Sequence, residues 1–126
     1  MARNLAEDRR VTADDFFRMT DVGRAELVDG EVVPMSPVGF VHSTIAVSIS
    51  ANLRAFAKAR GLGMVGVEAG FILGRDPDRV RAPDVAFVVA ARVEAAEQAE
   101  GFVPFAPDLA IEVLSPNDTF YDVEAK

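Results

Sequence analysis

The spacing of apolar residues predicts one long helix in the middle of the chain. Over residues 40–60, apolar side chains recur at intervals of four, four and three residues, at Ile45, Ile49, Leu53 and Phe56. This spacing places them on one face of a helix. His42 lies on the same face near the helix start, and Gly61 follows the last turn, where glycine commonly ends a helix.

Residues 11–33 predict a short helix followed by a hairpin. Thr12 and Asp15 stand at the spacing of a helix-capping box. Asp29-Gly30 lies between two apolar runs, which is a strong hairpin signal because glycine tolerates positive φ.

Two further regions predict the core strands. Residues 64–89 contain one strand from Met64 to Leu73, a turn, and a second extended stretch up to Val89. Residues 108–114 are almost continuously apolar, which predicts a central strand covered on both faces. A final helix is predicted to start within residues 118–126. Because that strand lies so near the end, we expect the single domain, 1–126, to be a C-terminally shortened form of a longer one.

Composition narrows the chemistry. The chain has 126 residues, half of them hydrophobic, which suits one globular domain. Without cysteine it has no disulfide scaffold, thiol nucleophile or thiolate zinc site, and its one histidine excludes a multi-histidine metal site. A bound metal would therefore depend on carboxylates, which favour magnesium, manganese or calcium. No secretion signal or membrane span is visible, so we expect a cytoplasmic protein.

The charge distribution both opposes and permits binding to nucleic acid. A net charge of −7 argues against it, because phosphate contacts need lysine and arginine. However, no acid occurs between Val32 and Val67, and this region holds Arg54, Lys58 and Arg60. These cations are the first candidates for DNA contact, ahead of Arg75, Arg79 and Arg81. A solvated helix end whose cations complement the helix dipole explains the first group equally well.

Two carboxylates stand out. Glu112 lies inside an apolar strand, where an unpaired carboxylate is costly, so a cation, an arginine or a raised pKa must compensate it. Asp84 follows Pro83 at the start of a strand, where an aspartate often merely caps a turn. If the two strands are neighbours, the carboxylates converge, and a hard divalent cation between them relieves their repulsion.

These residues resemble a known family. Glu112-Val113-Leu114-Ser115-Pro116, Pro83-Asp84-Val85, the hairpin from Glu26 to Glu31 and a helix headed by His42 are similar, in order and spacing, to the Uma-type family of bacterial endonuclease-like proteins. The resemblance runs from about Val11 to Lys126. It implies an α/β, restriction-endonuclease-like fold of the PD-(D/E)XK superfamily, with a mixed central sheet flanked by helices.

The resemblance also implies roles for individual residues. Asp84 and Glu112 match metal ligands, and the carbonyl of Val113 would be a third ligand, for Mg²⁺ or Mn²⁺. Glu26 matches an acidic hairpin residue with a water-mediated contact. His42 matches a family position without an assigned role.

The sequence departs from the superfamily pattern at its lysine. Val113 and Leu114 occupy the X and K positions, so no lysine points with Glu112. The resemblance implies that Lys126, on the following helix, replaces it and orients the attacking water. An ordinary surface lysine is the competing interpretation.

The leading hypothesis is a Mg²⁺-dependent endonuclease that hydrolyses DNA, possible as a homodimer and without a membrane partner. Two alternatives remain: a non-catalytic interaction module on the same fold, and a metal-dependent hydrolase of small phosphate esters such as nucleotides.

Overall fold

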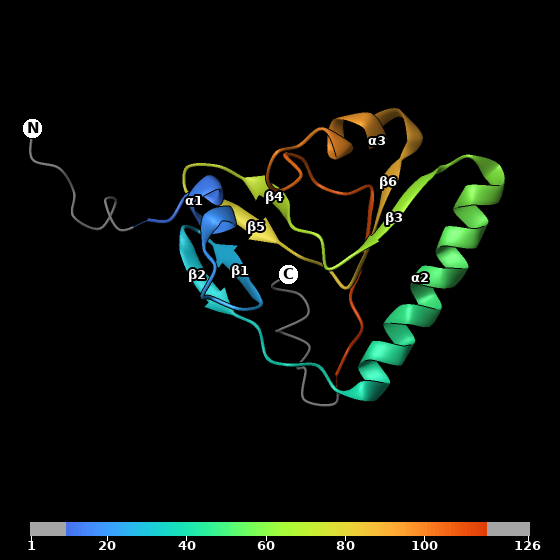
Figure 1. The fold of residues 1–126 in the computed structure, drawn as a ribbon, viewed down its shortest axis with the longest axis horizontal. Helices are drawn as coiled ribbons and strands as arrows, with labels where there is room; N and C mark the ends of the chain where they lie inside the picture. The colour runs from blue at the N-terminus through green and yellow to red at the C-terminus, as the bar shows by residue number, and fades with distance from the viewer. Residues whose placement is uncertain (1–9, 116–126) are drawn as a thin grey trace, which may run out of the picture.

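The computed structural model describes residues 10–115, which form two antiparallel sheets and three helices (Figure 1). In chain order the elements are α1 (Ala13–Arg18), β1 (Ala25–Val28), β2 (Glu31–Pro34), α2 (Phe40–Arg60), β3 (Gly63–Val67), β4 (Phe71–Gly74), β5 (Arg79–Arg81), β6 (Val85–Val89), α3 (Ala90–Glu97) and β7 (Leu109–Ile111). Sheet A has the strand order β2-β1-β5-β4, and sheet B has the order β3-β6-β7. The α/β fold is confirmed, and its sheet consists of these two antiparallel parts with one parallel bridge, between Phe71 and Val103.

The predicted N-terminal helix and hairpin are confirmed. The Thr12 hydroxyl accepts a hydrogen bond from the Asp15 amide at 3.1 Å and so caps α1. Asp29 and Gly30 both have positive φ, at 49° and 80°, and join β1 to β2 in the tight turn that such residues favour. The Asp78 carboxylate accepts from the Ala13 amide at 2.8 Å, which ties the start of α1 to the distant β4–β5 turn.

One long bent hairpin connects the two sheets. The register that pairs β3 with β6 in sheet B continues in the pairing of β4 with β5 in sheet A. Its arms separate at residues 68–70 and 82–84, which we call the bend. The prediction of a single strand from Met64 to Leu73 is therefore wrong. Glu68 has a positive φ of 58°, which ends β3. A Cβ on Gly70 would lie 2.4 Å from the Phe102 ring, so glycine fits at this position without displacing the ring.

The second arm bends at Pro83. Proline has no N–H to donate to a ladder, so it suits the interruption between β5 and β6. The extended stretch expected from Val80 to Val89 is thereby divided between two sheets.

The prediction that residues 108–114 form a central strand covered on both faces is also wrong for the described part of the chain. Strand β7 comprises Leu109–Ile111 and lies at the edge of sheet B. Leu109 is 44% exposed and Leu114 is 60% exposed. An apolar run indicates that burial is favourable, but it does not specify which neighbours supply it.

Helices cover both faces of sheet B. Gly66 lines a small apolar cavity with Val93 and Ala96 of α3, whereas Val67 lines a groove with residues of α2. Because neighbouring strand residues point to opposite faces, α3 and α2 lie on opposite sides of the sheet (Figure 1). The predicted long helix is confirmed as Phe40–Arg60 and ends at Gly61, which has φ 61°.

The apolar face of α2 is only half covered. Ile49 and Leu53 are half-buried, while Ile45 and Phe56 remain exposed. Among the helices of the described residues, none is long and apolar enough to cross a membrane.

Candidate active site

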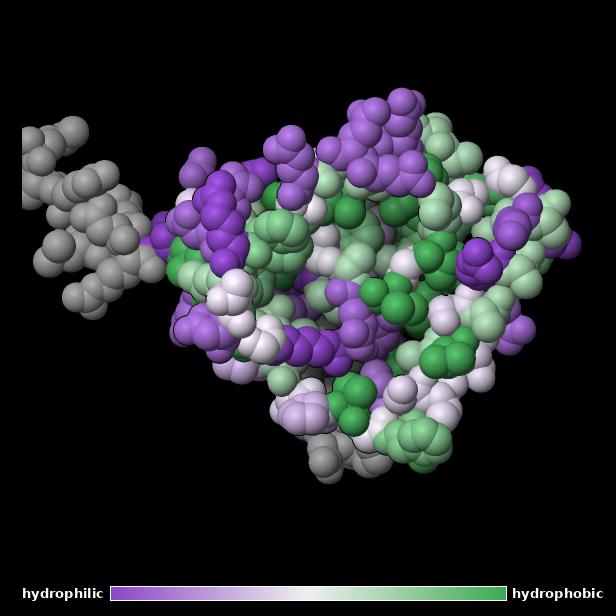
Figure 2. Space-filling view, in the orientation of Figure 1, coloured by the Kyte–Doolittle hydropathy of each residue, from purple (hydrophilic) through white to green (hydrophobic). Residues whose placement is uncertain are grey.

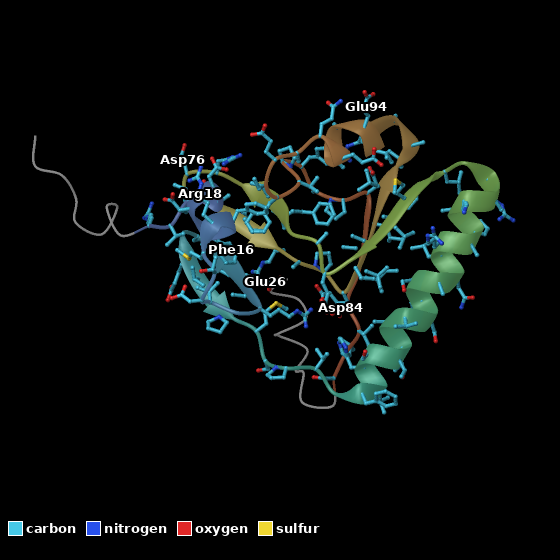
Figure 3. All side chains as sticks on the ribbon, in the orientation of Figure 1. Phe16, Arg18, Glu26, Asp76, Asp84 and Glu94 are labelled. Atoms are coloured by element: carbon cyan, nitrogen blue, oxygen red, sulfur yellow. The ribbon has the colours of Figure 1, made fainter. Side chains whose placement is uncertain are left out.

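The bend of the long hairpin brings together residues from widely separated parts of the chain. Its centre is Asp84, which is 7% exposed and immediately precedes β6. Figure 3 shows Asp84 near the middle of the molecule, between the β1–β2 hairpin and the first turns of α2, with Glu26 on the hairpin side. A carboxylate this buried needs compensating partners.

Three groups contact the Asp84 carboxylate. Its Oδ2 accepts a hydrogen bond from the Val113 amide at 2.7 Å, and lies 3.4 Å from His42 Nε2. Its Oδ1 lies 3.5 Å from Nη2 of Arg24. Asp84 therefore holds the backbone just after β7 against the start of α2 and the start of β1.

The register of β6 with β7 ends beside Asp84. The last pair of these strands is Val85 with Ile111, so the next residues along the two strands are Asp84 and Glu112. On the other side, the pairing of β3 with β6 ends at Val67 with Val85, and the Arg24 Nη2 that faces Asp84 also lies 3.8 Å from Glu68 Oε1. The convergence of Asp84 and Glu112 expected from the sequence stays a prediction.

Glu26 is engaged by the other arm of the bend. It is 5% exposed, its Oε1 accepts from Arg81 at 3.1 Å and its Oε2 accepts from the Ala82 amide at 2.9 Å. Oε2 therefore fixes the backbone two residues before Asp84, and Oε1 holds the Arg81 side chain. These contacts indicate that Glu26 positions Asp84. The metal ligands of the site would be other groups.

His42 lies at the N-terminal end of α2, and 12% of its side chain is exposed. Its Nε2 faces Asp84, while its Nδ1 is buried and has no hydrogen-bond partner within residues 10–115. The imidazole thus closes the site on the α2 side.

The donor atoms suit a hard divalent cation. Within residues 10–115, no three histidine, aspartate or glutamate side chains form a cluster that would hold a metal alone. Magnesium, however, commonly takes one or two carboxylates and fills its remaining positions with water and substrate phosphate. Asp84 and the backbone of Val113, which the Asp84 carboxylate holds in place, would supply oxygen ligands of that kind, and Glu112 is the further ligand expected from the sequence.

Two site residues were not identified from the sequence, Arg24 and Glu68. Arg24 lies two residues before Glu26, so strand alternation places both on the same face, a signal that the sequence does contain. Glu68 offered no local signal, because only its contact with Arg24 places it in the site.

The candidate DNA-contact residues separate into two groups. Arg54 and Lys58 line a groove between α2 and β3, together with Ser50, Val65 and Val67. Arg60 instead turns back on its own helix: its guanidinium carbon lies 3.8 Å from the Phe56 ring centre, and Nη1 donates to the Phe56 carbonyl at 3.2 Å.

Of the second candidate group, Arg81 is engaged by Glu26, while Arg75 and Arg79 form ion pairs around the far β4–β5 turn. Lys126 and the predicted final helix lie outside the described residues.

The chain matches the model of a known family. The model of the Uma2 family, described as "Putative restriction endonuclease", matches residues 13–126. The chain belongs to the Uma2 family. The resemblance inferred from its motifs is thereby confirmed, and membership of the family supports a nuclease function in general. A search of curated proteins found no match.

A solved structure shares the fold of this Uma2 chain. It is described as a "putative nuclease belonging to DUF820" from Anabaena variabilis, and superposes with a TM-score of 0.73 at 23% sequence identity. The match covers 91% of this chain and 64% of the other protein, so the chain corresponds to somewhat less than two thirds of that protein.

Proposed function

We propose that this chain is a Mg²⁺-dependent nuclease that hydrolyses phosphodiester bonds in DNA, with Asp84 and Glu112 as its metal-binding carboxylates. The observation that carries the proposal is the hydrogen bond from the Val113 amide to Asp84 at 2.7 Å, just beyond the last pair of β6 with β7, which brings the residue after Glu112 to the Asp84 carboxylate. Membership of the Uma2 family supports the nuclease class.

Each residue has a defined part in this proposal. Asp84, Glu112 and the Val113 carbonyl hold the cation, which when bound lowers the pKa of a water molecule and offsets charge on the phosphate. Glu26 fixes the backbone before Asp84 through the Ala82 amide. His42 orients the second oxygen of Asp84 from α2. Lys126 is proposed to orient the attacking water.

DNA would reach the site along α2. Arg54 and Lys58 lie in the groove on this helix, and α2 also carries His42 at its start, so a duplex bound along the helix would span from the groove to Asp84. Arg60 is left out of this surface because its guanidinium packs on Phe56.

The proposal is tested with the full chain and supercoiled plasmid in the presence of Mg²⁺ or Mn²⁺. We expect cleavage by the wild type, and a loss of at least about 100-fold in rate for Asp84→Asn or Glu112→Gln, since disturbing even an indirect partner of a metal costs roughly 10–100-fold. Asp21→Asn and Glu100→Gln change exposed carboxylates in the same way and serve as matched controls.

Equal cleavage by the wild type and the Asp84→Asn, Glu112→Gln double variant would refute the proposal. A calorimetric titration without Mg²⁺ or Mn²⁺ binding at millimolar concentration would favour the interaction module instead. Release of phosphate from mononucleotides, with plasmid left intact, would favour the hydrolase of small phosphate esters.

A further inference from the structure

Arg24 is a cation at the centre of the candidate site that none of the roles above uses. It lies immediately before β1, and 26% of its side chain is exposed. One terminal nitrogen, Nη2, faces both Asp84 Oδ1 at 3.5 Å and Glu68 Oε1 at 3.8 Å. It thus lies between two carboxylates of the candidate site.

The two contacts leave much of the guanidinium uncommitted. Tight charge-assisted hydrogen bonds measure about 2.7–2.9 Å, so both contacts of Nη2 are long. The Nε–H group of Arg24 is buried and has no hydrogen-bond acceptor within residues 10–115. Buried donors are normally paired, and an exception calls for an explanation, such as a ligand that completes the site.

By comparison, Arg81 in the same region shows what a committed arginine looks like. Its Nη1 donates to Glu26 Oε1 at 3.1 Å, and that carboxylate is fully engaged with the bend. Arg24 has no equally close carboxylate among the described residues, although it lies nearer to the proposed metal ligands.

A phosphate-binding site beside these carboxylates requires a positively charged side chain. Glu112 is followed by Val113 and Leu114, so no lysine accompanies it on its strand, and residues 61–115 contain no lysine at all. A phosphodiester at this site would bring negative charge next to two or three carboxylates. The guanidinium group, a planar fork of donors that stays charged, is the side chain best matched to phosphate oxygens.

We propose that Arg24 is a phosphate-binding catalytic residue: its guanidinium, beside Asp84 and Glu68, binds a non-bridging oxygen of the substrate diester. This inference rests on the proposed nuclease function and names a further residue of the same site.

The chemical part of Arg24 is electrostatic. In hydrolysis, a water molecule gives up one proton as its oxygen forms a bond to phosphorus, the bond from phosphorus to one sugar oxygen breaks, and that oxygen takes up one proton, so protons balance. Arg24 neither gives nor takes a proton, because its guanidinium stays protonated. It offsets the charge that builds up on the non-bridging oxygens, where a correctly aimed donor is most effective.

The decisive experiment follows the Nε–H signal of Arg24 by NMR. The signal is assigned by its disappearance in Arg24→Lys, and then followed in the full-length Glu112→Gln chain during titration with a short DNA duplex and Mg²⁺. We expect a saturable shift of the Arg24 signal, with no shift at Arg18, an exposed arginine on α1 paired with Asp15 (Figure 3). An unchanged Arg24 signal, whether or not the duplex binds, would overturn the inference.

Kinetics separates this inference from the function on which it rests. Arg24→Ala is expected to lower kcat about 100-fold, in the range found for removing one aimed donor, and Arg24→Lys to recover only part of it, because lysine keeps the charge and loses the fork. Arg18→Lys is the matched control. Wild-type cleavage with unchanged kcat in folded Arg24→Lys and Arg24→Ala would refute the role of Arg24 alone, whereas no cleavage by the wild type would refute the nuclease function itself.

Discussion

The two sheets of this molecule contain similar apolar residues, but the edge strands of sheet B leave theirs far more exposed than the core strands of sheet A. In sheet A, Leu27 and Val80 are 0% and 2% exposed, in a cluster with Ala13, Phe16 and Ile72. In sheet B, the central strand β6 buries Val85, whereas Met64 and Val67 on the edge strand β3 are 52% and 55% exposed. Figure 2 shows hydrophobic surface over the middle and right of the molecule, on the side of α2. Apolar character alone therefore does not decide burial; the layers packed on each strand do.

The difference has a consequence for the site. Glu26 lies on β1 and Arg24 immediately before it, and Leu27 of the same strand is anchored in the core of sheet A. Glu112 and Val113 follow β7, an edge strand of sheet B. Asp84 joins the two parts through the Val113 amide. The candidate site thus combines a part on the core of sheet A with a part at the edge of sheet B.

The largest expected effect comes from making the same leucine-to-alanine change in each of the two sheets. Leu27→Ala should lower the free energy of unfolding by about 3–5 kcal/mol, because it opens a cavity in a closed core. Leu109→Ala, on the 44% exposed edge strand, should cost less than about 1 kcal/mol. Urea denaturation of both variants measures this. Equal losses would mean that sheet B is covered as well as sheet A.

A second pair of substitutions examines strand β3 in sheet B. Gly63 has φ 153°, and a Cβ there would lie 2.0 Å from the Val88 carbonyl oxygen, whereas a Cβ on Gly66 meets nothing within 4 Å. We expect Gly63→Ala to cost about 2–4 kcal/mol through strain and overlap, and Gly66→Ala less than about 1 kcal/mol. Thermal unfolding in parallel checks the pair. A stable Gly63→Ala variant would show that β3 can shift away from β6.

The smallest expected effect concerns the start of β7. The hydrogen bond from the Val89 amide to Asp108, with Arg92 adding a second bond at 2.8 Å, holds the pKa of the Asp108 carboxyl below its usual 3.8. Because the pKa is lower in the folded state, this contribution to stability is present above about pH 4 and is lost as the pH falls through the lowered value.

Asp108→Asn should therefore be slightly less stable than the wild type at pH 6, with the difference shrinking below pH 4. Urea denaturation at a series of pH values measures it. A difference independent of pH would contradict this assignment of the shift.

The sequence predicted the parts of the fold that depend on local patterns. The apolar spacing over α2, the Asp29-Gly30 turn and the cap at Thr12 each act within a few residues, and each is confirmed. The predictions for residues 64–73 and 108–114 were wrong, because a strand pattern does not reveal where a strand leaves one sheet for another, or which of its sides is covered.

For the site, the order of motifs pointed to Asp84, Glu112 and the family; the comparison confirms the family, and the roles of the two acids stay predictions. Arg24 and Glu68 were missed, because their relevance comes from the contacts of Arg24 with Asp84 and with Glu68, across 60 and 44 positions of sequence.

By itself, the sequence determined the chemical inventory of this protein: no thiol, one histidine, and acids at the ends of two apolar strands. The tertiary structure alone decided which of these groups meet. The bend of one hairpin and the register of β6 with β7 set Asp84 among Arg24, His42 and Val113. The physical reason is that side-chain types and local periodicity are properties of short segments, whereas a site of this kind is created by pairing between strands far apart in the chain.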